Sequence, residues 1–457
     1  FKQKTAYEIY QCDWSSDVCS SDLAAGEEAK QILMKSVAFK TQEGEGNVPK
    51  LAAWYATLLK DAGYTDDAIE ITPIGETATM AVTLKGSDSA LKPILLSGHM
   101  DVVAAKREDW ERDPYTPVEE HGYIYGRGAE DNKYDVSMMV EAMAQLKRAG
   151  FTPRRSVILL LSGDEETLMS TTRVLAAKNK DAELLLNGDG GGGLIGPDGK
   201  PVMYLLQAGE KTYADFDLTF TDPGGHSSTP TATNPLYRLA RALEKLSIFQ
   251  FPAMSNELTR ASLAAGAPRI GGEVGAAMAA YAKDPNDMKA AATLSAIPDM
   301  VGQVRTTCVA TMASAGHAQN ALPQRASANI NCRIFPGVSV ESVKTDLEKL
   351  IADPTAKLTT LDDPVASDAS PLRQDVVNAV TKAVRARYPG ISIAPNMSAG
   401  ATDSVHFRAL GVPSYGIASL FMKAEDSFAH GLNERVPTSG IAGAVVQWQS
   451  VITDLSK

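Results

Sequence analysis

Residues 156–166 read SVILLLSGDEE, a run of aliphatic side chains that ends in two adjacent glutamates. A short apolar run bounded by turn residues is typical of a strand buried on both faces, so residues 156–162 are predicted to form an interior strand. Glu165 and Glu166 follow the strand's end, where neighbouring carboxylates are costly unless cations neutralise them. The segment therefore predicts both a sheet interior and a charged site at its edge.

Strands and helices alternate on both sides of this run. Residues 93–97 form a second predicted strand that ends just before His99, and residues 136–146 repeat apolar side chains at helical spacing. Residues 184–187 form another short apolar strand ahead of Asp189. This alternation predicts an α/β fold in which a mixed sheet is covered by helices on both faces.

The pattern changes near residue 208, which predicts a second, smaller domain. Residues 215–220 alternate apolar and polar side chains as in a half-exposed strand, and residues 236–246 form an amphipathic helix. The alternation of strands with helices then resumes towards the C-terminus. The expected boundaries are residues 24–207 and 368–457 for the first domain, and residues 208–367 for an inserted α+β domain.

Two segments stand apart from this organisation. Residues 250–300 are rich in Ala and Met and are expected to be helical, with no readable role. Residues 1–23, FKQKTAYEIYQCDWSSDVCSSDL, resemble translated sequencing-adapter sequence, so we expect a non-native segment in place of the true N-terminus. The protein is then expected in the periplasm or outside the cell if a signal peptide has been lost, and in the cytoplasm otherwise.

Composition argues against two classes of partner. The 457-residue chain carries a formal net charge of −11, and its Lys and Arg residues are spread thinly, which disfavours nucleic acid. It holds no run of about 18 uncharged apolar residues, so no membrane span is expected. Cys308 and Cys332 lack the spacing of a zinc motif. The excess of acidic residues is instead available to surround cations.

Two histidines and several carboxylates stand at or beyond the predicted strand ends. His99 is followed by Asp101, whose carboxylate could accept a hydrogen bond from the imidazole nitrogen that does not bind metal. Asp131 lies in the turn GRGAEDNK ahead of a helix, where an N-cap role is the alternative. Asp189 follows a strand, and His430 lies in the late segment FAHG. Together these residues fit a dinuclear site for a metal such as zinc.

The order of these motifs resembles the dinuclear zinc metallopeptidases that include aminoacylases, succinyl-diaminopimelate desuccinylases and glutamate carboxypeptidases. The resemblance rests on His-x-Asp, Gly-Arg-Gly-x-x-Asp-x-Lys, Glu-Glu, a later Asp and a late His, and it covers residues 24–457. It implies two divalent metal ions, expected to be zinc, with cobalt or manganese as alternatives. The implied ligands are Asp131 as the bridge, His99 and Asp189 at one ion, and Glu166 and His430 at the other.

The resemblance also implies a reaction. Glu165 would be the general base that takes a proton from a metal-bridging water as the water attacks the carbonyl carbon. The expected substrate is a small peptide or an N-acyl amino acid, cleaved at the bond next to a free amino-acid carboxylate. The expected enzyme is an exopeptidase or dipeptidase of carboxypeptidase-like type. The alternatives are an N-acyl-amino-acid deacylase and a non-catalytic binding homologue.

The inserted domain carries candidates of its own. His226, in the turn DPGGHSS, is similar to a lid histidine that stabilises the oxyanion, often from the partner subunit of a homodimer; the alternative is a solvated turn histidine. Asn320 and Arg333 match substrate-binding positions, and Arg333 could bind a carboxylate or be a plain surface residue. The insert is therefore expected to be a lid and dimerisation domain. A looser match covers a loop near the substrate: Gly400, Thr402 and Asp403.

Overall fold

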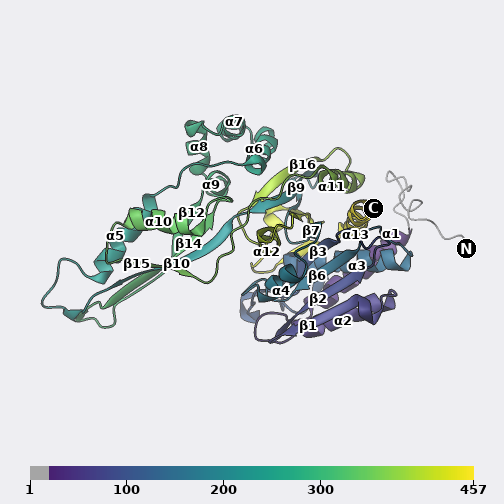
Figure 1. The fold of residues 1–457 in the computed structure, drawn as a ribbon, viewed down its shortest axis with the longest axis horizontal. Helices are drawn as coiled ribbons and strands as arrows, with labels where there is room; N and C mark the ends of the chain where they lie inside the picture. Colours follow the sequence, from purple (N-terminus) through teal and green to yellow (C-terminus); the bar gives the residue numbers. More distant parts are fainter. Residues whose placement is uncertain (1–19) are drawn as a thin grey trace, which may run out of the picture. The chain divides into compact units, whose positions relative to one another are not determined.

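The computed structural model describes residues 20–457, which form two compact units (Figure 1). The first unit runs to Ala208 and is completed by Ser370–Pro395 and Thr402–Lys457, and the second consists of Gly209–Ala369 and Asn396–Ala401. We expected Asn396–Ala401 in the first domain. It groups with the second because the N–H of Lys211 donates to the carbonyl of Ser398 at 3.0 Å. The expected non-native segment lies outside the described residues except for residues 20–23.

A ten-stranded mixed sheet forms the centre of the first unit. Its strands are β1 Ile69–Ile74, β2 Thr77–Leu84, β3 Ile94–His99, β6 Val157–Ser162, β7 Leu184–Asn187, β8 Gly192–Ile195, β9 Pro201–Glu210, β16 Ser392–Ser398, β17 Ser414–Gly416 and β18 Phe421–Lys423. The order is β1-β2-β6-β3-β7-β17-β9-β8-β18, with β16 paired to β9. The strands β6, β3, β7 and β17 are parallel neighbours, whereas β2 pairs antiparallel with both β1 and β6. The expected α/β fold with a mixed sheet is confirmed.

Helices cover both faces of this sheet (Figure 1). Their bounds are α1 Ser20–Val37, α2 Val48–Asp61, α3 Tyr134–Arg148, α4 Ser170–Lys178, α11 Gln374–Arg387, α12 Ser404–Ala409 and α13 Ile441–Leu455. On one face α13 packs against α1, α3 and α11, and α2 packs on α3; on the other face α4 packs on α12. Phe407 of α12 joins Leu95 of β3 and Leu160 of β6 in one buried cluster. The aliphatic runs are interior strands because both of their faces are covered.

The second unit has its own antiparallel sheet and its own core. Its elements are β10 Thr212–Thr221, β12 Thr307–Ala315, β14 Arg325–Ile334, β15 Lys357–Leu361, α5 Pro235–Ile248 and α10 Val340–Ile351. The strand order is β12-β14-β10-β15. Alternate residues of β10 are buried, and Phe216 packs in a cluster with Leu239 of α5 and Leu347 of α10. Cys308 and Cys332, opposite each other in β12 and β14, form a disulfide.

A group of four helices occupies most of residues 250–300, where helices were expected. They are α6 Glu257–Ile270, α7 Gly272–Lys283, α8 Met288–Ser295 and α9 Pro298–Val304. Leu263, Tyr281 and Leu294 give these helices a separate buried cluster. Across residues 20–457, none of the helices combines the length and the apolar character needed to cross a membrane.

Replacing Phe216 with Ala should destabilise the second unit by about 3–5 kcal/mol, because Phe216 is fully buried and the change leaves a cavity. The control Ile248→Ala removes a side chain that is 80% exposed in the same unit, and it should cost less than about 0.5 kcal/mol. Denaturant unfolding, followed by hydrogen exchange in β10 and β14, measures both. Equal losses for the two variants would contradict the packing described.

Candidate metal centre

The ends of three neighbouring strands bring the candidate ligands to one edge of the first unit's sheet. His99 ends β3, Glu165 and Glu166 follow β6, and Asp189 follows β7. β3 lies between β6 and β7 and runs parallel to both. Because parallel strands finish at the same edge, the side chains that follow them converge there.

Asp131 and His430 reach the same place from two loops. Asp131 lies in a single turn, Ala129–Lys133, directly before α3, and His430 lies between β18 and the short strand β19 (Arg435–Pro437). His99 Nε2 is 2.9 Å from Asp131 Oδ1, and His430 Nε2 is 3.1 Å from Asp131 Oδ2. Each carboxylate oxygen of Asp131 therefore faces one imidazole, which is the position a bridging ligand needs.

The remaining distances complete two overlapping sets of donors. His430 Nε2 is 2.9 Å from Glu166 Oε2, and His99 Nε2 is 3.9 Å from Asp189 Oδ2. One set joins His99, Glu165 and Asp189, the other joins His99, Asp131 and Glu166, and the donor atoms within each set lie within 4.8 Å of one another. Imidazole nitrogen and carboxylate oxygen together suit zinc and similar divalent ions. The donor set therefore fits divalent cations.

The pKa shifts within the cluster also indicate a site for cations. Burial raises the pKa of Glu165 well above its usual value, and the nearby carboxylates of Asp189 and Asp403 add to the rise. Burial also raises the pKa of Asp189, with a further contribution from Asp131. Hydrogen bonds to Asp131 and Glu166 raise the pKa of His430 to about 10. All three shifts have the sign expected where negative charge is in excess, and cations would relieve that excess.

Asp101 contacts His99 through a different atom from the one expected. His99 Nδ1 is 3.1 Å from the backbone carbonyl of Asp101 but 3.7 Å from its carboxylate. The carboxylate instead accepts the backbone N–H groups of Glu165 and Glu166, at 3.1 and 3.0 Å, which hold it away from the ring. Because a carbonyl only accepts, Nδ1 carries a proton, which leaves Nε2, the atom that faces Asp131, as the ring nitrogen that could bind a metal ion. Asp101 thus holds the candidate ligand His99 and the Glu-Glu segment together.

Glu434, which the sequence did not single out, connects the two ligand-bearing loops. Its fully buried carboxylate accepts a hydrogen bond of 2.7 Å from Arg127. It also accepts three backbone N–H groups, those of Gly128, Glu130 and Asp131, at 3.0, 2.8 and 3.1 Å. Arg127 in turn donates to the carbonyl of Gly431, next to His430. Only a glutamate four residues after His430 marked this position in the sequence, and nothing distinguished it from a surface acid.

Asp403 and Thr402 lie beneath the strand ends of the first unit. The buried carboxylate of Asp403 accepts the hydroxyls of Ser162 at 2.7 Å, Ser97 at 3.4 Å and Thr172. The buried Thr402 hydroxyl accepts from the Asn187 side chain at 3.1 Å. Both side chains thus brace β3, β6 and β7, a role that the looser motif match did not suggest. Substrate binding by Thr402 stays a prediction.

His226 and Asn320 belong to the second unit, on neighbouring loops. The short strands β11 (Gly225–His226) and β13 (Ala321–Leu322) pair, and the N–H of Ser227 donates to the carbonyl of Asn320 at 3.0 Å. His226 is exposed, and its Nδ1 accepts the N–H of Ser228 at 3.1 Å. The neutral ring therefore carries its proton on Nε2, where it is free to donate to a developing oxyanion.

Arg333 and Gly400 also lie near each other in the second unit. Arg333, on β14, donates to the carbonyl of Ala399 at 3.4 Å. Its guanidinium group lies 4.6 Å from the centre of the Tyr213 ring, on the adjacent strand β10. The backbone N–H of Gly400 donates to the Ser398 hydroxyl at 3.0 Å. These contacts hold the guanidinium group beside the Gly400 loop, and the roles of both residues towards a substrate stay predictions.

Comparison with known proteins places the chain in a wider group. The sequence model of Peptidase family M20/M25/M40 matches residues 95–454. N-fatty-acyl-amino acid synthase/hydrolase PM20D1.1 of Danio rerio is 29% identical over 370 residues, which cover 78% of this chain and 70% of the relative.

Solved structures share the fold. The M20 family metallo-carboxypeptidase Sso-CP2 from Sulfolobus solfataricus has a TM-score of 0.70 at 19% identity, covering 94% of this chain and 99% of that one. The di-peptidase Dug1p from Saccharomyces cerevisiae has a TM-score of 0.67 at 17% identity, covering 95% of this chain and 98% of that one. At these identities the likeness concerns the fold alone.

Replacing Glu434 with Gln should weaken zinc binding by about 10–100-fold, as is usual when a group that holds metal ligands in place is lost. A neutral amide cannot accept Arg127 and three N–H groups as the carboxylate does. Competition between metal-free protein and a chelating dye measures the affinity, and circular dichroism checks the fold. The control Glu425→Gln removes the same charge from an exposed position. Equal affinity for both variants would refute the role given to Glu434.

Proposed function

This chain belongs to Peptidase family M20/M25/M40, and we propose that the bond it hydrolyses lies next to a free amino-acid carboxylate. Membership confirms the resemblance carried by the motifs, and the chain is a metal-dependent hydrolase of peptide or amide bonds. The observation that carries the proposal is the cluster of carboxylates around His99 and His430, whose charge two divalent cations would balance. The carboxylate requirement follows from the candidate role of Arg333.

Each metal position has an assigned set of side chains in this proposal. Asp131 is the bridge, His99 and Asp189 complete one position, and Glu166 and His430 complete the other. Zinc is the proposed ion, and cobalt and manganese suit the same donors. When bound, the ions would acidify water and balance the charge that develops on the substrate's carbonyl oxygen.

Glu165 is the proposed general base. Its carboxylate lies among the donor atoms of His99 and Asp189, and Asp101 fixes its backbone. In this position Glu165 would accept the proton of the attacking water and pass it to the leaving nitrogen. Asp101 would act by positioning, because it fixes both His99 and Glu165.

The second unit is proposed to bind the substrate. Arg333 would hold the free carboxylate, helped by Asn320 and by the loop of Gly400 and Thr402. His226 would stabilise the oxyanion through its Nε2 proton, and we propose that it acts across a homodimer as part of a lid. The support is the tautomer set by Ser228.

Two substrate classes fit this chemistry. A peptidase of exopeptidase, dipeptidase or carboxypeptidase-like type and an N-acyl-amino-acid deacylase both attack an amide beside a carboxylate, so the metal centre does not separate them. The Danio rerio relative is named as an N-fatty-acyl-amino acid synthase/hydrolase, which favours the second class. A non-catalytic homologue is the remaining alternative, and loss of turnover on chelation would exclude it.

Replacing Glu165 with Gln should lower kcat by about 10²–10⁴-fold while metal content stays at the wild-type value, because the base is lost and the ligands remain. The assay is hydrolysis of a panel of dipeptides and N-acyl amino acids by chelated protein, with zinc, cobalt or manganese added back. The control Glu108→Gln changes an exposed acid of the same unit. Full activity of Glu165→Gln would show that another group is the base.

Replacing His226 with Ala should lower kcat by about 10²–10³-fold with little change in KM, because the lost donor acts on the transition state. Mixing Glu165→Gln and His226→Ala chains tests action across a dimer. A mixed dimer would pair one intact Glu165 with the partner's intact His226, so about a quarter of wild-type activity should return. If mixed dimers form and stay inactive, His226 does not act across the interface.

A further inference from the structure

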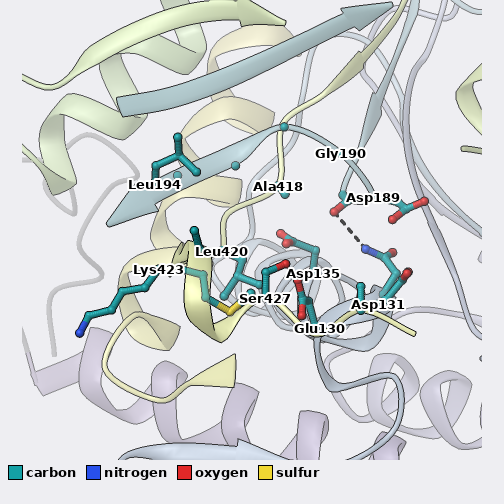
Figure 2. A pocket seen from close by; sticks show the side chains of 18 residues that line it. Glu130, Asp131, Asp135, Asp189, Gly190, Leu194, Ala418, Leu420, Lys423 and Ser427 are labelled. Carbon is teal, nitrogen blue, oxygen red and sulfur yellow. Dashed lines mark hydrogen bonds between the residues drawn. The ribbon is translucent and has the colours of Figure 1, made fainter. Parts of the chain in front are cut away.

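The first unit contains a large cavity that lies apart from the metal centre. The smaller cavity drawn in Figure 2, of about 240 Å³, is lined by Asp131 and Asp189 and so belongs to the centre itself. The larger one, of about 660 Å³, opens between helices α1, α2 and α3, and we call it the helix cavity. Among the described residues, the candidate metal ligands do not line it. Its volume lies in the range of about 300–1,000 Å³ that is typical of small-molecule sites.

Most of the wall of the helix cavity is apolar, and all three helices contribute to it. Ile32 comes from α1, Trp54 and Leu58 come from α2, and Val140 and Ala144 come from α3. Ile32, Val140 and Ala144 are buried, whereas Trp54 and Leu58 are half-buried. Each methylene group that such a wall removes from water strengthens binding about fourfold. The wall therefore favours a ligand with an apolar body.

One buried carboxylate also faces the helix cavity. Glu141, on α3, lines the cavity and is 1% exposed. Gln145 donates to its Oε1 at 2.5 Å, and Arg148 donates to the same oxygen at 3.5 Å. Within the described chain, no N–H group donates to the other oxygen, Oε2. Because a buried carboxylate oxygen without a donor is costly, Glu141 favours a ligand that donates hydrogen bonds to Oε2.

Negative charge is in excess around Glu141. Glu28, on α1, lines the same cavity, and Arg148 pairs with it at 2.7 Å. One guanidinium group therefore serves two carboxylates. Burial raises the pKa of Glu141 to about 7, the hydrogen bond from Gln145 opposes this rise, and the charge of Glu28 adds to it. A second cation beside Glu141 would balance the remaining negative charge.

The other charged side chains of the helix cavity do not remove this excess. Glu27 pairs with Lys30 at 2.9 Å, and Lys35 lies 5.8 Å from the centre of the Phe39 ring. Three acidic and two basic side chains line the cavity, so the lining carries one negative charge when Glu141 is ionised. This charge disfavours an anionic ligand such as a fatty acid and favours a cation.

We propose that the helix cavity binds an amphipathic organic cation, in which a primary ammonium group is attached to an apolar body. The ammonium group donates to Glu141 Oε2, where a charge-assisted hydrogen bond replaces the missing donor. The apolar body lies against Trp54 and Leu58. The proposal goes beyond the proposed function and does not depend on it, because the metal ligands and Glu165 take no part in this site.

The test measures Kd by calorimetry on the zinc-loaded full chain, with octylammonium as the probe. Propylammonium should bind more weakly, by about fourfold for each methylene group removed. Octanamide has a similar apolar body but no charge, and it should bind about 10–100-fold more weakly, because a hydrogen bond to an ionised group is worth more than a neutral one. Chelation of the zinc should leave the Kd of octylammonium unchanged.

Three variants locate the site. Glu141→Gln should weaken octylammonium binding about 10–100-fold and leave octanamide binding unchanged, because the amide keeps the shape and loses the charge. Gln31→Trp alters an exposed residue of α1 that lines the cavity, and the indole should weaken both ligands by occupying their space. The control Gln374→Trp alters an exposed glutamine of α11 that does not line the cavity, and it should keep the wild-type Kd. Circular dichroism checks the fold of each variant.

The proposal is supported if octylammonium binds, if its affinity depends on both charge and chain length, and if only the two cavity variants weaken it. It is overturned if octylammonium does not bind, if octanamide binds equally well, or if Gln31→Trp matches Gln374→Trp. Loss of binding on chelation would place the ligand at the metal centre and would also overturn it. Hydrolysis of dipeptides or N-acyl amino acids is a separate result, so the proposed function stands or fails independently.

Discussion

The gathering of negative charge at one sheet edge is the constraint on which this site depends. Asp131, Glu165, Glu166 and Asp189 share the space around His99 and His430. Carboxylates this close together and partly removed from water are stable only when protons or cations balance them. The fold brings these carboxylates together because parallel strands end at the same edge of the sheet, and bound cations would balance their charge. The chemistry of amide hydrolysis follows from the same charge balance, since ions that neutralise ligands also polarise a carbonyl.

A second set of acids holds the surrounding chain in place. Asp101, Asp403 and Glu434 are buried, and each accepts several N–H or hydroxyl groups of the surrounding chain. Their hydrogen bonds hold strand ends and loops in place, so the protein itself positions the candidate metal ligands. The cluster thus has inner carboxylates with few donors and outer carboxylates with many. That difference separates groups that would hold cations from groups that position them.

The part of the fold that sequence reveals is the part governed by local periodicity. The aliphatic runs of β3 and β6 mark their own ends, so the sequence alone places His99 and the pair Glu165 and Glu166 at a sheet edge. The alternation in β10 likewise identifies a second sheet. The positions of turn residues and of acids that follow a strand can be predicted locally. The end of the hydrophobic run marks the end of the strand, and the chain direction decides at which edge it lies.

Features that depend on contacts between distant segments could not be predicted from local sequence patterns. Glu434 binds the turn of Asp131 about three hundred residues earlier in the chain, and no local pattern reports such a contact. The grouping of Asn396–Ala401 with the second unit depends on a backbone hydrogen bond from Lys211 to Ser398. The Asp101 carboxylate was expected at His99, but its two bonds to the Glu-Glu segment place it elsewhere. In each case the residue that makes the deciding contact lies on another element of the fold.

Anomalous X-ray scattering at the zinc edge, from crystals of the zinc-loaded protein, tests most directly whether the strand-end cluster holds two divalent ions. We expect two peaks of comparable height, both in contact with Asp131, one also touching His99 and Asp189 and the other touching Glu166 and His430. A single peak, or peaks held by other residues, would contradict the dinuclear assignment and the reaction built on it.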